Sequence, residues 1–110
     1  MTLIEIKNML SSTGLPIAYY QYPVGQAPQL PYLVYYYPQS VNFGADNKVY
    51  QKANQLNIEL YSKQKSFELE ERIENVLDEF EIFYNKIESY IESEEMYEVL
   101  YESEVIINGE

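Results

Sequence analysis

Residues 96–107 alternate between apolar and polar side chains with a period of two, and this pattern constrains the fold more than any other feature of the sequence. One set of positions holds Tyr97, Val99, Tyr101, Val105 and Ile107, and the other holds Glu98, Glu102 and Glu104. Because successive side chains of a β-strand point to opposite faces, the pattern predicts a strand with one buried face. Such a strand needs other strands beside it and a second layer over its apolar face.

Two segments have the spacing of amphipathic helices. The first begins after Thr2, which fits a capping box with Glu5, and ends at residues 11–14. The second begins after Ser66, an N-cap residue. Its apolar stripe consists of Leu69, Ile73, Val76, Leu77 and Phe80. The acidic side chains of this second helix are expected to face solvent.

Three segments are predicted to be strands of the same sheet. Residues 17–22 are extended, and a loop rich in proline follows at residues 23–31. Residues 32–37 are continuously apolar or aromatic, which predicts an inner strand buried on both faces. Residues 50–61 alternate from Leu56 onward, so one face of this strand packs inward.

Residues 82–91 are compatible with two structures. The helical spacing of Tyr84, Ile87 and Ile91 would continue the second helix, whereas a strand would place Phe83, Ile87 and Ile91 on one face. We favour the strand, because residues 93–95 then form the turn of a hairpin with the alternating segment.

The predicted fold is a single α+β domain over residues 1–110 with the order α-β-β-β-α-β-β. Two helices are expected to pack on one face of a mostly antiparallel sheet of about five strands.

Residues 39–49 show no periodicity and favour turns. Eleven residues is long for a connection in a compact domain, where about 4–6 is typical. We therefore predict a mobile loop that reaches a neighbouring subunit or another protein. Its candidate contact residues are Val41, Phe43, Asp46 and Asn47. The spacing of a calcium-binding loop is absent, so Asp46 and Asn47 are interpreted as turn residues.

The residue types that most catalytic and metal sites need are scarce. The chain has no cysteine and no histidine, which removes thiolate chemistry and the Ser–His and Cys–His systems. Its four glycines form no phosphate-binding loop. We expect no enzymatic activity, no cofactor and no metal site.

The net charge of −11 is unevenly distributed. Residues 1–65 hold five lysines and three acids, a net of +2, whereas residues 66–110 hold two cations and 15 acids, a net of −13. An acidic half repels a phosphate backbone, so we expect no specific nucleic-acid binding. The N-terminus lacks a signal-peptide pattern and no apolar run reaches the ~18 residues of a membrane span, so a cytoplasmic protein is expected.

Tyrosine is unusually frequent, with 13 copies, seven of them between Tyr19 and Tyr37. Strands accept aromatic residues well, so these rings could simply fill the core. A small domain cannot bury so many hydroxyls with partners, however, and tyrosine is enriched where proteins meet. The candidate subunit contacts are Tyr19, Tyr20, Tyr35, Tyr36 and Tyr37.

Several stretches resemble minor structural proteins of long-tailed bacteriophages. They are NFGADNKVY at residues 42–50, NIELYS at 57–62, LEERIENVL at 69–77, and ESYIESEEMYEVLYE at 88–102. Residues 14–19 and 30–32 extend the similarity over nearly the whole chain. Specifically, the chain resembles the tail-terminator proteins (tail-completion or head–tail joining proteins) of siphophages and their prophages.

The resemblance implies a ring, commonly a hexamer, on the head-proximal end of the tail tube. Such a ring stops polymerisation of the tube and docks the head connector. The implied partners are further copies of the chain, the major tail-tube protein and a head completion protein. The implied location is the host cytoplasm during assembly and then the virion. An alternative from another class is a small acidic adaptor, or a DNA-mimic inhibitor, that acts as a monomer or dimer.

Overall fold

The computed structural model describes residues 1–108, apart from the side chains of Phe43, Ala45, Val49, Tyr50 and Gln51. Its main sheet has five strands in the order β1-β2-β5-β7-β6. In chain order they are β1 (Ile17–Tyr19), β2 (Tyr32–Tyr36), β5 (Ala53–Ser62), β6 (Tyr84–Ile91) and β7 (Met96–Ile106). β1 and β2 run parallel, and the other neighbours run antiparallel. A short 3-10 helix, η1 (Glu92–Glu94), joins β6 to β7.

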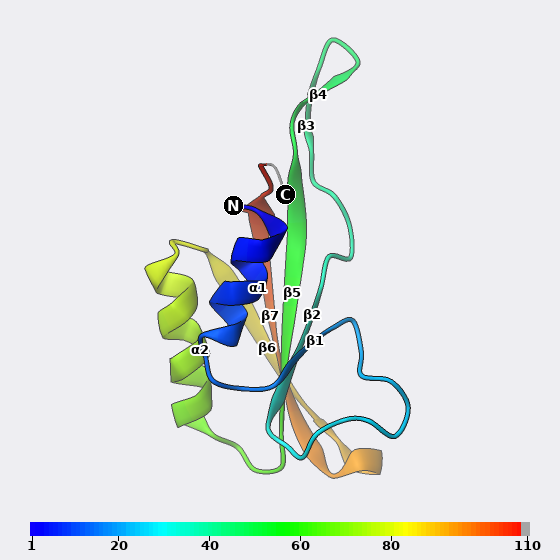
Figure 1. The fold of residues 1–110 in the computed structure, drawn as a ribbon, viewed down its shortest axis with the longest axis vertical. Helices are drawn as coiled ribbons and strands as arrows, with labels where there is room; N and C mark the ends of the chain where they lie inside the picture. The colour runs from blue at the N-terminus through cyan, green and yellow to red at the C-terminus, as the bar shows by residue number, and fades with distance from the viewer. Residues whose placement is uncertain (109–110) are drawn as a thin grey trace.

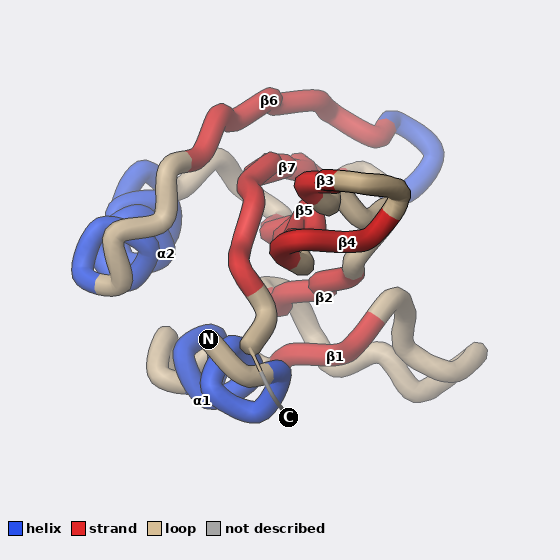
Figure 2. Tube along the Cα trace, turned by 90° about the horizontal axis from the view of Figure 1, so that it is seen from above, coloured by secondary structure: helices blue, strands red, loops and turns tan. Residues whose placement is uncertain are grey.

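The helices α1 (Leu3–Ser11) and α2 (Phe67–Glu79) lie on the same face of this sheet (Figures 1 and 2). Both begin where the sequence predicts. The amide of Glu5 donates to Thr2 Oγ1 at 3.1 Å, and the amide of Thr2 donates to Glu5 Oε1 at 2.8 Å, which completes the capping box. The amide of Leu69 donates to Ser66 Oγ at 3.2 Å. These bonds satisfy amides that lack a partner within the helix.

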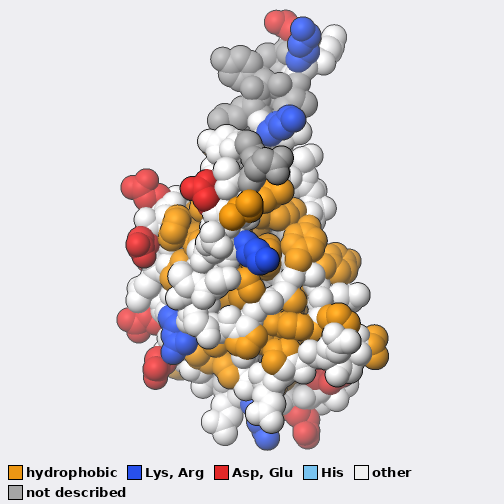
Figure 3. Space-filling model, viewed as in Figure 1, with side chains coloured by type: hydrophobic (Ala, Val, Ile, Leu, Met, Phe, Trp, Pro, Cys, Tyr) orange, Lys and Arg blue, Asp and Glu red, His pale blue; other side chains and the backbone are white. Residues whose placement is uncertain are grey.

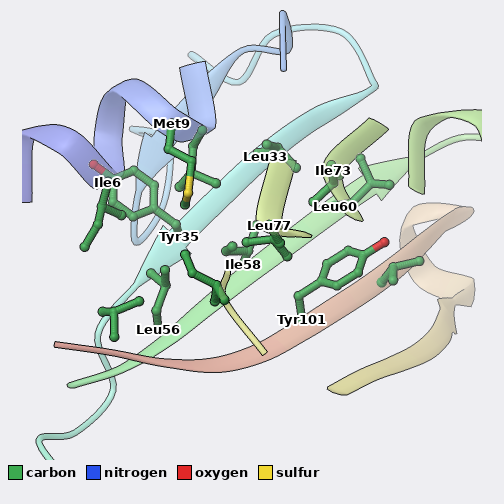
Figure 4. Packing of buried hydrophobic residues seen from close by; sticks show 14 residues of the cluster. Ile6, Met9, Leu33, Tyr35, Leu56, Ile58, Leu60, Ile73, Leu77 and Tyr101 are labelled. Carbon is green, nitrogen blue, oxygen red and sulfur yellow. The ribbon is translucent and has the colours of Figure 1, made fainter. Parts of the chain in front are cut away.

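The core lies between the helices and one face of the sheet (Figure 4). Helix α1 contributes Ile6, Met9 and Leu10, and helix α2 contributes Ile73 and Leu77, all at most 2% exposed. The strands contribute Leu33, Tyr35, Leu56, Ile58, Leu60, Val99, Tyr101 and Val105. Each fully buried leucine or isoleucine stabilises the fold by about 1.5–3 kcal/mol. The predicted α+β architecture, with two helices on one face of a mostly antiparallel sheet, is confirmed.

Individual strand predictions are also confirmed. Leu33, Val34 and Tyr35 are buried in succession, as expected for an inner strand covered on both faces. The segment that was compatible with helix or strand is β6, and its residues pair with β7 from Tyr84 opposite Ser103 to Ile91 opposite Met96.

The prediction of a loop over residues 39–49 is wrong for the part of that range that forms strands. Residues 43–51 form a second, two-stranded sheet of β3 (Phe43–Ala45) and β4 (Lys48–Gln51). Asp46 and Asn47 have φ values of 51° and 62°, the positive angles that a two-residue type I′ turn requires. Both are therefore turn residues, as predicted. The strand expected over residues 50–61 is interrupted, because β4 ends before β5 begins.

Two expectations for α2 are also wrong. Glu70 is only 2% exposed, although the acids of this helix were expected to face solvent. Phe80 is 43% exposed, although it was placed in the apolar stripe. The helix ends at Glu79, and Glu81 turns the chain with a φ of 57°, so Ile82 enters the core in place of Phe80.

Candidate assembly interface

Exposed apolar side chains gather where α1 meets the edge strand β1 (Figure 3). We call this surface, made of Leu3, Ile4, Tyr19 and Tyr20, the aromatic edge. Ile4 is 62% and Tyr20 64% exposed. Residues 8–45, which include β1, β2 and the loop between them, contain no charged side chain. Leu3, Ile4 and Tyr19 line one hollow together with Lys7, and exposed apolar surface of this kind is typical of sites where proteins associate.

Tyr20 reaches the surface through an unusual backbone conformation. It follows the last residue of β1 with a φ of 70°, a value that is rare for a bulky side chain. Its amide donates to the carbonyl of Tyr35 at 2.7 Å, which fixes the turn. The ring of Tyr20 then packs against Tyr36 with centroids 5.6 Å apart. Backbone strain of this kind persists only where the surroundings enforce it and is often found at functional sites.

A hollow of about 380 Å³ opens in the aromatic edge. Its walls are Leu3, Ile4, Lys7, Tyr19, Tyr35 and Tyr37. The rings of Tyr19 and Tyr35 meet edge to face at 5.3 Å. The hydroxyl of Tyr37 is buried without a hydrogen-bond partner, and its burial raises the pKa of Tyr37 to about 12. The hollow is therefore neutral except for Lys7 at its rim, which suits an apolar side chain.

The structure separates the five tyrosines that were predicted as contacts. Tyr19 and Tyr20 are on the surface, whereas Tyr36 and Tyr37 are half-buried. Tyr35 is only 8% exposed, so it supports the aromatic edge from beneath and offers little contact area itself. Tyr36 lies on the other face of β2, where its hydroxyl accepts a hydrogen bond from Asn57 at 3.4 Å.

The β3–β4 hairpin, which we call the arm, projects beyond the end of the main sheet (Figure 1). Asp46, Asn47 and Lys48 are exposed at its turn. Val41 is half-buried at its base, where its amide donates to the carbonyl of Ala53 at 2.8 Å. The side chain of Phe43 lies outside the described residues.

We call the sheet face opposite the helices the open face. It carries Glu59 on β5 and Glu98, Glu102 and Glu104 on β7, and Glu59 lies opposite Leu100, between the positions of Glu98 and Glu102. Partial burial and repulsion from Glu98 raise the pKa of Glu59, although the hydroxyl of Tyr61 donates to Glu59 at 3.1 Å. Burial also raises the pKa of Tyr61. Like charges held this closely favour a cation, or a partner that brings one.

A network of charges around one buried carboxylate, that of Glu70, was not expected from the sequence. Glu70 pairs with Lys65 at 2.6 Å and with Lys86 at 3.0 Å, and Lys86 also binds Glu74 at 2.8 Å. Lys65 forms a further ion pair with Glu88 on β6. Burial alone would raise the pKa of Glu70, but hydrogen bonds from the two lysines outweigh it and lower that pKa.

This network joins α2 to the edge strand β6. The hydroxyl of Tyr101, from the centre of the core, donates to Glu74 at 2.8 Å and extends the network inward. Two signals in the sequence could have revealed it. Glu70 precedes Ile73 and Leu77 by three and seven residues, so it lies on the apolar stripe, and Lys86 is one of two cations in the acidic half.

Within residues 1–108, no group of three metal-ligating side chains is arranged to hold an ion. None of the described helices has the length and apolarity that a membrane crossing requires. No protein-family model matches the chain, and a search of curated proteins finds no significant match.

Proposed function

We propose that this protein is a bacteriophage structural protein, a tail terminator or head–tail joining protein that forms a ring on the tail tube. The projecting arm is the observation that carries the proposal. A domain whose helices and sheet already enclose a core gains little stability from a two-stranded hairpin beyond its end. An arm of this kind is suited to contact another subunit or another protein.

The aromatic edge supports the same function. It combines exposed tyrosine and aliphatic side chains, an apolar hollow and a long uncharged segment, which are properties of surfaces that associate. A ring around the path of the genome must also let DNA pass. Carboxylates that face the lumen would keep the duplex from adhering, because they repel phosphate.

The partners in this proposal are other copies of the chain, the major tail-tube protein and the head completion protein. Assembly would take place in the host cytoplasm, and the ring would then remain in the virion at the junction of head and tail.

The test is the mass of the particle in solution. We expect light scattering to report a closed oligomer of about six copies, alone or with the tail-tube protein of the same phage, and electron microscopy to show rings at tube ends. Monomers or dimers at every concentration, with tubes left uncapped, would exclude the ring. Should such a monomer inhibit a DNA-binding enzyme, the acidic DNA mimic becomes the better interpretation.

The arm can be tested separately by the double substitution Val41→Ser and Phe43→Ser. We expect capping of tubes to be abolished while the thermal midpoint changes by only a few degrees, because Val41 is half-buried at the base of the arm and does not belong to the core cluster. Val24→Ser is the matched control, since Val24 is fully exposed in another loop. Unfolding by the double substitution would mean that these side chains stabilise the monomer.

A further inference from the structure

We propose that the arm of one copy inserts Lys48 into an acidic hollow on the open face of the next copy. This contact rests on the ring proposed above and identifies the surfaces that would join its subunits.

The acidic hollow has a volume of about 450 Å³ and is lined by residues of β5, β7, the start of β6 and the residue before β6. These residues are Gln55, Phe83, Asn85, Glu102, Ser103 and Glu104. The ring of Phe83 is 79% exposed and forms an aromatic wall beside the two carboxylates. Carboxylates pair with an ammonium group, and the face of an aromatic ring attracts it as well. The hollow therefore suits the end of a lysine side chain.

The arm carries a cation, Lys48, that forms no ion pair with the side chains that the structure describes. The chain has seven basic residues. Lys65 and Lys86 are held in ion pairs, and Arg72 donates to the carbonyl of Thr13 at 3.2 Å. Of the remaining four, Lys48 stands on the arm and Lys52 at its base, both exposed.

Lys48 cannot reach the acidic hollow of its own copy. The arm continues away from the main sheet (Figure 1), and Gln55 lies seven positions after Lys48. At about 3.3 Å per residue this distance is roughly 20 Å, far more than a lysine side chain spans. Complementary charges thus lie at two separate places on one chain. A contact between unlike surfaces is heterologous, and repeated with the proper rotation it closes a ring.

Charge reversal tests the contact. Lys48→Glu, and separately Glu102→Lys with Glu104→Lys, are each expected to weaken self-association by about tenfold or more. An equimolar mixture of the two variants should assemble again, because each arm then meets a hollow of opposite charge. Such rings must alternate and therefore contain an even number of copies, which native mass spectrometry can count.

Lys63→Glu is the matched control for Lys48→Glu, and Glu92→Lys with Glu94→Lys is the matched control for the double variant, since each makes an equal change of charge at exposed sites outside both surfaces. Circular dichroism checks that each variant folds, and Glu104→Lys alone replaces the double variant if that one does not.

The inference is overturned if Lys48→Glu assembles like the unmodified protein, or if the mixture of the two variants fails to assemble. If Lys48→Glu forms normal rings that no longer cap tubes, Lys48 contacts the tail-tube protein and not the next copy, and the proposed function still holds. Absence of rings from the unmodified protein would instead refute the proposed function.

Discussion

The two edges of the main sheet are held in different ways. At β6, Lys86 and Glu88 form ion pairs with side chains of α2 and the segment before it. At β1, Tyr19 and Tyr20 stack on tyrosines of β2, within a segment that has no charge. Inward-pointing charges on an edge strand discourage its pairing with another sheet, whereas an uncharged aromatic edge favours contact. We therefore expect the proposed association to use the edge at β1, and we expect no pairing of strands along the edge of β6.

Removing the charge at the centre of the β6 network should have the largest effect. Glu70→Ala leaves Lys65 and Lys86 without their shared partner, and we expect a loss of about 2–3 kcal/mol in the free energy of unfolding. This loss is small for the removal of one partner from a buried ion pair, because the side chain of Lys86 is 41% exposed and can turn to solvent. Urea denaturation measures it. Glu71→Ala, an exposed neighbour on α2, is the control and should change the free energy little. Equal effects of the two substitutions would show that the network does not stabilise this edge.

Substitutions in the aromatic edge should have a smaller effect on folding stability than Glu70→Ala, and a larger effect on self-association. Tyr19→Ser with Tyr20→Ser removes two exposed rings and their stacking, for an expected loss of about 1 kcal/mol. Sedimentation should show weaker self-association. Tyr90→Ser is the matched control at the other edge, since Tyr90 is also half exposed and stacks on Tyr97. If Tyr90→Ser weakens association as much, the two edges do not differ as proposed.

Those features of the fold that depend on local pattern could be predicted from the sequence. Val99, Tyr101 and Val105 lie on one face of β7 because side chains alternate along a strand, and this holds whichever strands are its neighbours. The caps at Thr2 and Ser66 are equally local. The arm was missed because Asp46-Asn47 is a less common type I′ turn than Asn-Gly, and its flanking residues do not alternate.

The charged network could not be predicted in the same way. Glu70 is buried only because Lys65 and Lys86 approach it from two other segments, and that approach depends on how α2 lies over β6. The surface properties of individual tyrosines also depend on tertiary structure. Tyr19 and Tyr35 have similar neighbours in the sequence, yet one belongs to an edge strand and the other to the core.

The smallest expected effect concerns a third site, the open face, where Glu59 and Glu98 repel each other. Partial burial and this repulsion raise the pKa of Glu59 above its ordinary 4.5, so the folded protein binds the proton more tightly than the unfolded chain does. The contribution of Glu59 to stability is therefore present below about pH 4.5, and it is lost as the pH rises through the pKa that Glu59 has in the folded protein. Glu70 has the opposite sign, because its lowered pKa gives stability that is present above 4.5 and lost as the pH falls.

Glu59→Gln should thus stabilise the protein at about pH 7, by less than about 1 kcal/mol because the side chain is partly solvated, and should have almost no effect below about pH 4. Glu70→Gln should destabilise it at about pH 7, and its effect should shrink as the pH falls. Thermal midpoints of both variants across this range measure the difference, with Glu68→Gln, an exposed acid, as the control. Parallel curves for Glu59→Gln and Glu70→Gln would mean that net charge governs the pH dependence. If the two curves instead approach that of the unmodified protein at low pH from opposite sides, the pH dependence comes from the surroundings of each carboxylate. Those surroundings include two lysines for Glu70 and a second carboxylate for Glu59.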